Sequence, residues 1–290
     1  MSGGGAAPPP EAVRKTGGVS AVVTVVIAIA TFLGGLGAGA FFFQAPPPAA
    51  QIIVGTNTPF PPFEFRDPTT GDLVGFDVDI MNEVGRRNNW DIIFRDFQDW
   101  DALLAAIEFR GVDVGASAIT SNLAGDPGLQ RNASFDFSDW YYEADQGVLI
   151  RKGTTAVTCA AAECTVDELA NHTVAVQTLT TSYWWVLGSL VDTGKTPEAM
   201  VRDFGDLNAV IQELLNGGVE WVLVDKPIAQ NFAATNPNLE VAGTIETNER
   251  YAFAVADGDP QNFLPKINAA LAAMEQDGTF QRILDKWFGA

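Results

Sequence analysis

The feature that most constrains this chain is a run of residues without a single charge, 19–43, near its N-terminus. A helix over this run would be roughly 37 Å long, enough to cross a bilayer core of about 30 Å with some tilt. Arg14 and Lys15 precede the run, which places that side in the cytoplasm and the rest of the chain outside. We predict a disordered tail over 1–18, a transmembrane anchor over 19–43 and a proline-rich linker over 44–50.

A cleaved signal peptide is the alternative interpretation of the same segment. The apolar region of a signal peptide is usually only about 7–15 residues long, but Ala38-Gly39-Ala40 offers a small-residue cleavage site. The first interpretation predicts a protein anchored in the cell membrane with its binding domain outside. The second predicts a secreted or periplasmic protein. Both place the folded part of the chain outside the cytoplasm.

Charge and composition exclude several classes of function. The chain has 36 acidic and 17 basic residues, a net charge of −19, one histidine and two cysteines. Nucleic acids and anionic lipid surfaces require clustered Lys and Arg, so neither is an expected partner. With so few His and Cys residues, a zinc or iron–sulfur site is hard to build, and we expect neither a metal nor a cofactor.

The two cysteines, Cys159 and Cys164, are separated by four residues in a small-residue stretch. A loop this short closes as a disulfide that stabilises the fold by roughly 2 kcal/mol, and disulfides are typical of exported proteins. A redox-active pair is the alternative, but such pairs usually have the tighter Cys-x-x-Cys spacing at a helix start. The spacing favours a structural disulfide.

From residue 51 onwards, strand and helix patterns alternate along the chain. The alternation predicts an α/β fold with mostly parallel sheets covered by helices on both faces. The predicted strands cover residues 51–56, 91–94, 112–118, 148–150, 173–177, 221–224 and 251–255. The predicted helices cover residues 77–84, 100–109, 207–215 and 260–287, the last interrupted at Gly278.

Five sequence blocks in order resemble one family over nearly all of residues 51–290. They are Val54-Gly55-Thr56-Asn57-Thr58-Pro59-Phe60-Pro61-Pro62-Phe63-Glu64-Phe65, Gly75-Phe76-Asp77-Val78-Asp79-Ile80, Asp136-Phe137-Ser138-Asp139-Trp140-Tyr141-Tyr142, Asp277-Gly278-Thr279-Phe280 and Lys286-Trp287-Phe288. In these blocks the chain is similar to the extracytoplasmic solute-binding proteins of polar amino-acid ABC transporters. That family includes glutamine-, histidine- and arginine-binding proteins.

The resemblance implies a two-lobed periplasmic-binding-protein-like fold of type II, with a hinge and a ligand cleft between the lobes. Lobe 1 would comprise residues 51–144 and 248–290, and lobe 2 residues 145–247. Two crossover strands, near 143–147 and 244–249, would join them. The protein would be a monomer that traps an amino acid when the lobes close and delivers it to an ABC transporter permease.

The resemblance also implies which residues hold the ligand. A buried carboxylate needs an Arg together with hydroxyl or backbone donors, and a buried ammonium needs a carboxylate. Arg131, five residues before Asp136, corresponds to the family's carboxylate-binding arginine, and Asp225 corresponds to its ammonium-binding aspartate. The other implied ligand contacts are Ala118 and Thr120 in the first lobe, Thr180 and Thr181 at a turn of the second, Phe60 and Trp100 as aromatic walls, and Asn57 and Gln177 at the ligand's side chain. Leu179 departs from the family, in which many members have Gly.

Two other functions are weighed against binding and transport. Some proteins of this fold are dehydratases of a cyclic carboxylic acid, with Glu64 or Asp77 as a conceivable acid; Asp225 argues against this, because such a substrate has no ammonium group to pair with it. An amino-acid sensor is the other alternative, which would need a separate partner chain. Neutral Asn57 and Gln177 favour a glutamine-like ligand over a dicarboxylate. A basic amino acid stays open if Asp77 and Glu64 lie near the cleft.

Overall fold

The computed structural model describes residues 48–122 and 131–289. The predicted tail and anchor, 1–18 and 19–43, lie outside the described residues. Among the residues that are described, none of the helices is both long enough and apolar enough to cross a membrane. The described residues form one compact unit, and the predicted division of this unit into two lobes stays a prediction.

A five-stranded sheet has the strand order β4-β1-β5-β13-β7. Its strands are β1 (Ala50–Asn57), β4 (Trp90–Phe97), β5 (Val114–Gly115), β7 (Phe135–Phe137) and β13 (Ala254–Ala256). β1 pairs in parallel with β4 and β5, whereas β13 runs antiparallel to both β5 and β7. The strand predicted over 112–118 is shorter in the structure, where β5 contains only Val114 and Gly115. A further pair, β2 (Phe65–Arg66) and β3 (Leu73–Val74), forms a small separate sheet.

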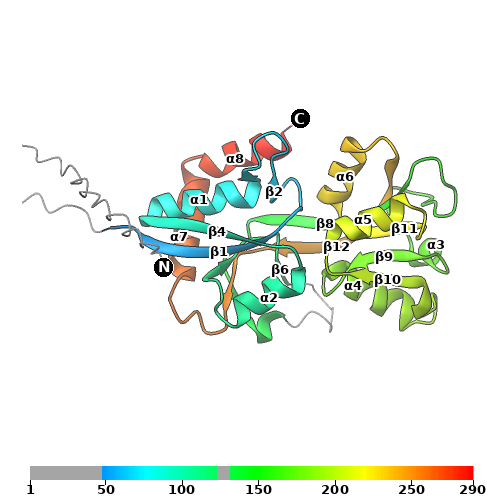
Figure 1. Cartoon of the computed structure of the whole chain (residues 1–290), viewed down its shortest axis with the longest axis horizontal. Helices are drawn as coiled ribbons and strands as arrows, with labels where there is room; N and C mark the ends of the chain where they lie inside the picture. Colours follow the sequence, from blue (N-terminus) through cyan, green and yellow to red (C-terminus); the bar gives the residue numbers. More distant parts are fainter. Residues whose placement is uncertain (1–47, 123–130, 290) are drawn as a thin grey trace, which may run out of the picture. The chain divides into compact units, whose positions relative to one another are not determined.

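Helices cover the five-stranded sheet from both sides. They are α1 (Phe76–Asn88), α2 (Trp100–Glu108), α7 (Leu264–Gln276) and α8 (Thr279–Phe288). Figure 1 shows α1 and α8 on one side of β1 and β4, and α2 on the other. α1 starts after Gly75, whose φ of 143° favours glycine, and a Cβ atom there would lie 1.9 Å from the carbonyl oxygen of Phe63. This glycine lets α1 start in close contact with the loop between β1 and β2, residues 58–64, which we call the Phe63 loop.

A six-stranded sheet has the order β10-β9-β11-β8-β12-β6. Its strands are β6 (Thr120–Asn122), β8 (Tyr142–Arg151), β9 (Val174–Gln177), β10 (Val201–Phe204), β11 (Trp221–Asp225) and β12 (Leu239–Tyr251). β9 pairs in parallel with β10 and β11, but β8 is antiparallel to β11 and β12, and β12 is antiparallel to β6. The prediction of mostly parallel sheets is therefore wrong, since both sheets are mixed.

The helices of this part are α3 (Val166–Leu169), α4 (Thr181–Val186), α5 (Leu207–Leu215) and α6 (Lys226–Thr235), with a π-helical turn (Leu187–Val191) after α4. Two short 3-10 turns, Arg131–Ala133 and Glu198–Met200, complete the described elements. Both faces of the six-stranded sheet are covered by helices. Val222 and Val224 belong to the same apolar cluster as residues of α5 and α6, while Trp221 and Leu223 pack with residues of α4. A strand buried on both faces reads as a continuous apolar run, which is why β11 was predictable.

The antiparallel pair β8 and β12 contains both predicted crossover segments. The pairing runs from Leu239 opposite Arg151 to Tyr251 opposite Tyr142, with a register shift between Ile245 and Glu249. The strand predicted over 251–255 is wrong in its bounds, because β12 ends at Tyr251 and β13 starts at Ala254. Polar residues such as Glu240 and Glu246 interrupt the apolar pattern of β12, so its length was not readable from the pattern.

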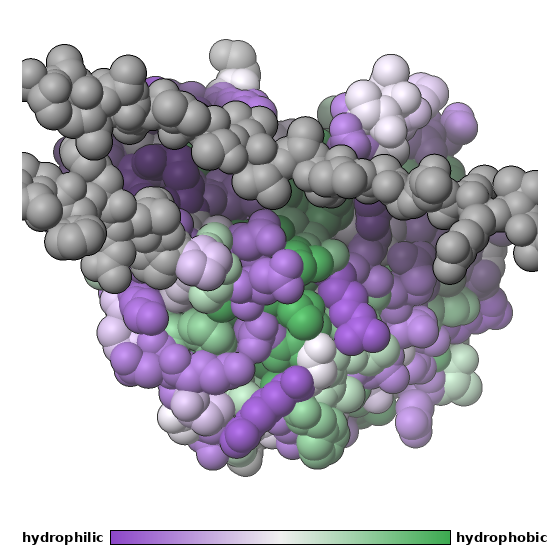
Figure 2. All heavy atoms as spheres, turned by 60° about the vertical axis from the view of Figure 1, so that its left-hand side comes forward, coloured by the Kyte–Doolittle hydropathy of each residue, from purple (hydrophilic) through white to green (hydrophobic). Residues whose placement is uncertain are grey.

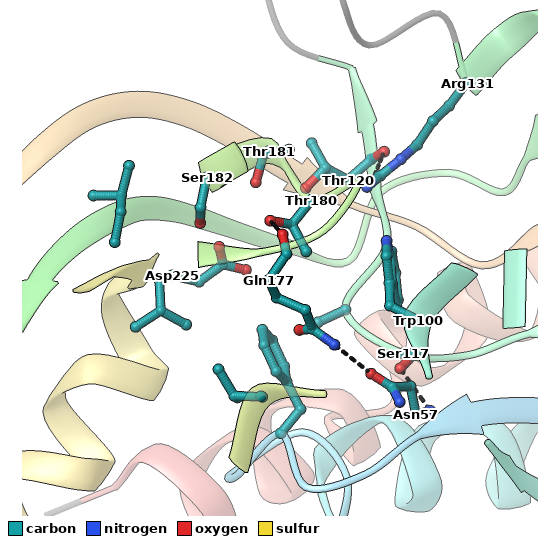
Figure 3. A pocket seen from close by; sticks show the side chains of 15 residues that line it. Asn57, Trp100, Ser117, Thr120, Arg131, Gln177, Thr180, Thr181, Ser182 and Asp225 are labelled. Atoms are coloured by element: carbon teal, nitrogen blue, oxygen red, sulfur yellow. Dashed lines mark hydrogen bonds between the residues drawn. The ribbon is translucent and has the colours of Figure 1, made fainter. Parts of the chain in front are cut away.

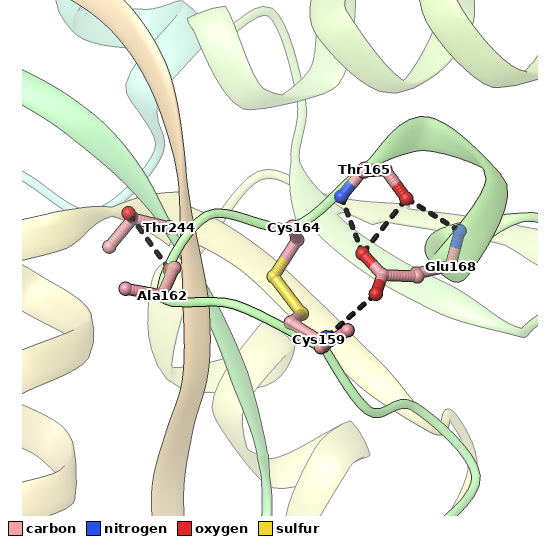
Figure 4. The surroundings of a disulfide bond; sticks show 7 residues. Cys159, Ala162, Cys164, Thr165, Glu168 and Thr244 are labelled. Carbon is pink, nitrogen blue, oxygen red and sulfur yellow. Dashed lines mark hydrogen bonds between the residues drawn. A yellow bond between two sulfur atoms is a disulfide. The ribbon is translucent and has the colours of Figure 1, made fainter.

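The predicted disulfide joins Cys159 and Cys164 (Figure 4). The loop that it closes lies against β12, where backbone N–H groups of Cys164 and Thr244 donate to the carbonyls of Thr244 and Ala162, each at 2.8 Å. Thr165 then caps α3 in a reciprocal pair of hydrogen bonds with Glu168. The disulfide thus fixes a loop that covers part of the edge of β12.

The surface seen in Figure 2 is mostly hydrophilic, with hydrophobic residues gathered in a narrow band. This is consistent with the strongly acidic composition, in which 36 carboxylates outnumber 17 basic side chains. Most of the charge is solvated, so the buried charged groups described next are exceptions that need partners.

Candidate ligand-binding site

A cavity with about 460 Å³ of space between atoms, part of it open to solvent, lies where strands of both sheets end. It brings together all ten side chains that the sequence singled out for ligand contact (Figure 3). They are Asn57, Phe60, Trp100, Ala118, Thr120, Arg131, Gln177, Thr180, Thr181 and Asp225. The carboxyl ends of strands in α/β sheets are where ligands commonly bind.

Arg131 lies in the first turn after the undescribed segment and is only 8% exposed. Its guanidinium donates to the carbonyl of Thr120 at 3.0 Å and to that of Leu179 at 3.4 Å, and it stacks over the ring of Trp100 with 5.3 Å between centres. Burial lowers its pKa to about 10, although the nearby Glu249 and Asp225 oppose this. The group is therefore cationic at neutral pH, and its planar fork matches a carboxylate.

Asp225 ends β11 and is 6% exposed. Its carboxylate accepts hydrogen bonds from the amide of Gln146 and the hydroxyl of Tyr251. Burial is the main cause that raises its pKa to about 7, and the charge of Glu249 raises it further. Among the described residues, no Lys or Arg forms an ion pair with Asp225. An ammonium group brought into the cavity would supply that missing positive charge.

The turn between β9 and α4 supplies polar groups to the cavity. Leu179 adopts a left-handed conformation with φ of 59°, which explains why glycine suits this position. Its carbonyl accepts from Arg131 and from the indole N–H of Trp100, at 3.4 and 3.3 Å. Thr180 caps α4 by accepting from the N–H of Tyr183. The Leu in place of Gly therefore leaves the turn intact.

Away from Arg131 and Asp225, the side chains that line the cavity are uncharged. The amide of Gln177 donates to the side-chain oxygen of Asn57 at 3.2 Å, which links the ends of β9 and β1. The backbone N–H of Asn57 donates to Ser117 at 3.0 Å. Apolar walls come from Phe60, Leu207, Leu223 and Val224. Such a pocket combines apolar surface with a few amide and hydroxyl groups.

Residues 52–290 match the model of the bacterial extracellular solute-binding proteins, family 3. The chain belongs to this family. The members of the family and the relatives named below are substrate-binding proteins.

Two relatives cover most of this solute-binding protein. A probable histidine-binding protein of Neisseria gonorrhoeae is 32% identical over 239 residues, which is 81% of this chain and 82% of the relative. The ABC transporter glutamine-binding protein of Bacillus subtilis is 28% identical over 240 residues, 82% of this chain and 81% of the relative.

Solved structures have the same fold. An ancestral arginine-binding protein bound to arginine has a TM-score of 0.73 and 31% identity, covering 83% of this chain and all 100% of that one. An ancestral arginine-binding protein bound to glutamine has a TM-score of 0.72 and 31% identity, covering 83% and 99%. These matches confirm the predicted periplasmic-binding-protein-like α/β fold.

Sequence reasoning missed five residues that line the cavity of this solute-binding protein: Ser117, Ser182, Leu207, Leu223 and Val224. Ser117 and Ser182 are direct neighbours of predicted contacts, so the same loops signalled them. The three apolar residues look like ordinary core positions of a helix and a strand, because their pattern is that of buried faces. No feature of the sequence separates them from the core.

Glu64 and Asp77, the acids considered near the cleft, do not line the cavity. Glu64 accepts from the hydroxyl of Ser117 at 2.6 Å, and Asp77 accepts from the N–H of Ala118 and the hydroxyl of Tyr141, each at 2.7 Å. Burial raises the pKa of Glu64 well above its ordinary value and that of Asp77 to about 7. Both carboxyls therefore support the cavity wall from behind.

Proposed function

We propose that this protein binds a polar amino acid outside the cytoplasm and delivers it to the permease of an ABC transporter. The observation that carries the proposal is one cavity lined by both a buried Arg131 and a buried Asp225. The guanidinium would hold the ligand carboxylate and the aspartate its ammonium. Each of these ligand charges needs a partner when water is excluded.

Arg131 and Asp225 lie on elements that belong to different parts of the chain. Arg131 directly precedes β7 of the five-stranded sheet, and Asp225 ends β11 of the six-stranded sheet. An amino acid held by both would bridge the two sheets. Its binding would therefore favour a closed arrangement, in proportion to the contacts that only the closed form makes. We infer that the protein acts as a monomeric two-lobed trap with residues 145–247 as its second lobe.

The favoured ligand has a neutral polar side chain, such as glutamine. Asn57, Ser117 and Gln177 offer amide and hydroxyl groups beside apolar walls. Among the lining residues, Arg131 is the one basic side chain and Asp225 the one acidic side chain. A second ligand carboxylate would lack a cation, and a basic side chain would lack an acid, since Glu64 and Asp77 stay behind the wall.

The proposal is tested by measuring thermal unfolding of the full-length chain with each of the twenty amino acids. A ligand at a hundred times its Kd stabilises the folded state by about 2.7 kcal/mol, which corresponds to a rise in Tm of roughly 5–10 °C. We expect the largest shift with glutamine or another neutral polar amino acid. Mass spectrometry after long incubation should return the ligand unchanged, whereas a dehydrated product would indicate an enzyme.

We further propose that residues 19–43 anchor the protein in the membrane. If they do, protein from its native host should stay with the membrane fraction through high-salt and alkaline washing. Its intact mass should include the sequence N-terminal to residue 19. A mature N-terminus at or near Phe41 would instead show that the segment is a cleaved signal peptide.

A further inference from the structure

Gln146 lies behind the cavity, on β8, and is fully buried. Its amide nitrogen is 2.5 Å from Asp225, 2.6 Å from Glu249 and 3.2 Å from the hydroxyl of Thr181. An amide nitrogen has only two hydrogens, so the two short contacts to the carboxylates take both. Its oxygen accepts from Ser182 at 2.6 Å, which fixes the orientation of the amide. Gln146 therefore bridges two carboxylates.

Glu249 is the second of these carboxylates and is also fully buried. It lies on β12 next to the register shift, and its other oxygen accepts from the hydroxyl of Thr120 at 2.7 Å. Thr247 donates to the oxygen that Gln146 also contacts, at 3.1 Å. Within the part of the chain that the structure describes, Glu249 forms no ion pair with Lys or Arg. The hydrogen-bond donors to Glu249 in this part of the chain, Thr120, Gln146 and Thr247, are thus all neutral.

Together, Gln146 and Glu249 contact four residues of the cavity wall without lining the cavity themselves. Gln146 contacts Asp225, Thr181 and Ser182, and Glu249 contacts Thr120. They reach the wall from the two long strands that carry the chain between the sheets. Asp225 itself ends β11, where it pairs with Gln146 of β8 and accepts from Tyr251 of β12.

We propose that Gln146 and Glu249 are a pair of positioning residues that sets how strongly Asp225 holds the cationic group of the ligand. The proposal rests on the proposed function, because it assumes that Asp225 receives an ammonium. Gln146 donates to Asp225 and so favours its charged form, whereas the charge of Glu249 disfavours it. The two members of the pair act on Asp225 in opposite directions.

The other ionisable groups around Asp225 come from three elements. Tyr251 of β12 donates to Asp225, the Arg131 guanidinium attracts it, and Glu64 of the Phe63 loop repels it. Substitutions at 146 and 249 leave these side chains in place. The charge of Glu249 also raises the pKa of Arg131, but that pKa of about 10 lies well above the range from pH 6 to pH 8. A change in the pH dependence of binding in such variants therefore reports on the pair itself.

The test is calorimetric titration of L-glutamine, or of the amino acid with the largest thermal shift, into the full-length protein at pH 6 and pH 8. The variants are Glu249→Gln and Gln146→Leu, which nearly preserve side-chain volume. Glu246→Gln is the matched control, because Glu246 is an exposed acid on the same strand. Thermal unfolding verifies that each variant is folded.

The readout is the ratio of the affinity at pH 8 to that at pH 6. We expect this ratio to fall in Glu249→Gln and to rise in Gln146→Leu, with about tenfold weaker binding of Gln146→Leu at pH 8 because Asp225 loses a donor. The control should keep the ratio of the unmodified protein. If Gln146 and Glu249 only supported the structure of the site, their substitution would weaken binding equally at both pH values.

An unchanged ratio in Glu249→Gln, in protein that binds the amino acid normally, would overturn the inference and leave the proposed function standing. If the unmodified protein binds no amino acid, the proposed function fails and the inference fails with it. If Gln146→Leu does not fold, Glu249→Gln still decides, because it is isosteric.

Discussion

Arg131→Ala is expected to weaken amino-acid binding by about a hundredfold or more. The substitution removes a charge-assisted, two-pronged contact from a buried site and leaves the ligand carboxylate partly unpaired, which costs on the order of 3 kcal/mol. Arg131→Lys should also bind poorly, because an ammonium cannot reproduce the planar fork that contacts Thr120 and Leu179. Calorimetric titration measures both effects directly.

Arg110→Ala is the matched control for this prediction, since Arg110 is exposed after the end of α2. It should bind the ligand as the unmodified protein does. Undiminished affinity in Arg131→Ala would contradict the assignment of the carboxylate-binding role. A parallel loss in Arg110→Ala would point to a general effect of lost positive charge.

Asp225→Asn should abolish detectable binding of amino acids. The ligand's ammonium would then be buried without an anion, and breaking a buried ion pair from one side costs about 3–5 kcal/mol. The fold should survive, because asparagine has nearly the same shape and still accepts from Tyr251. Fluorescence titration, with Trp100 in the cavity wall as the reporter, measures the loss. Tight binding in this variant would show that the ammonium lies elsewhere.

The same carboxylate makes affinity depend on pH. In the unliganded protein the pKa of Asp225 is raised to about 7, mainly by burial and also by Glu249, so part of the population carries a proton at neutral pH. An ammonium favours the charged form, so binding releases that proton. Affinity should therefore fall as the pH is lowered through 7, by up to about tenfold per unit. Affinity that is constant from pH 8 to pH 5.5 would contradict this.

The fold could be predicted where single elements carry clear patterns. Strands such as β9 and β11 are buried on both faces and read as apolar runs, and α5 has the bounds 207–215 that its periodicity predicted. β12 could not be predicted in this way, because its stability comes from pairing with β8 along its length while its own residues are largely polar. Pairing partners distant in the chain leave no local signal.

The site could be predicted as far as family resemblance assigns positions. All ten predicted contacts line the cavity, although their roles toward a ligand stay predictions. Gln146 and Glu249 could not be found, because a glutamine and a glutamate in polar strands look like solvent-facing residues. Only the antiparallel pairing of β8 with β12 and β11 brings them to Asp225. Their importance is a property of the tertiary structure.

The position of β13 has a consequence for how this protein is made. β13 contains residues 254–256, yet it lies between β5 and β7, which were synthesised more than a hundred residues earlier. Until β13 arrives, β5 is an exposed edge and β7 lacks its partner in the sheet. Exposed edges pair readily with other chains. A nascent or translocating chain must therefore be kept from aggregating until β13 is available. β13 completes the first sheet only after every strand of the six-stranded sheet has been synthesised.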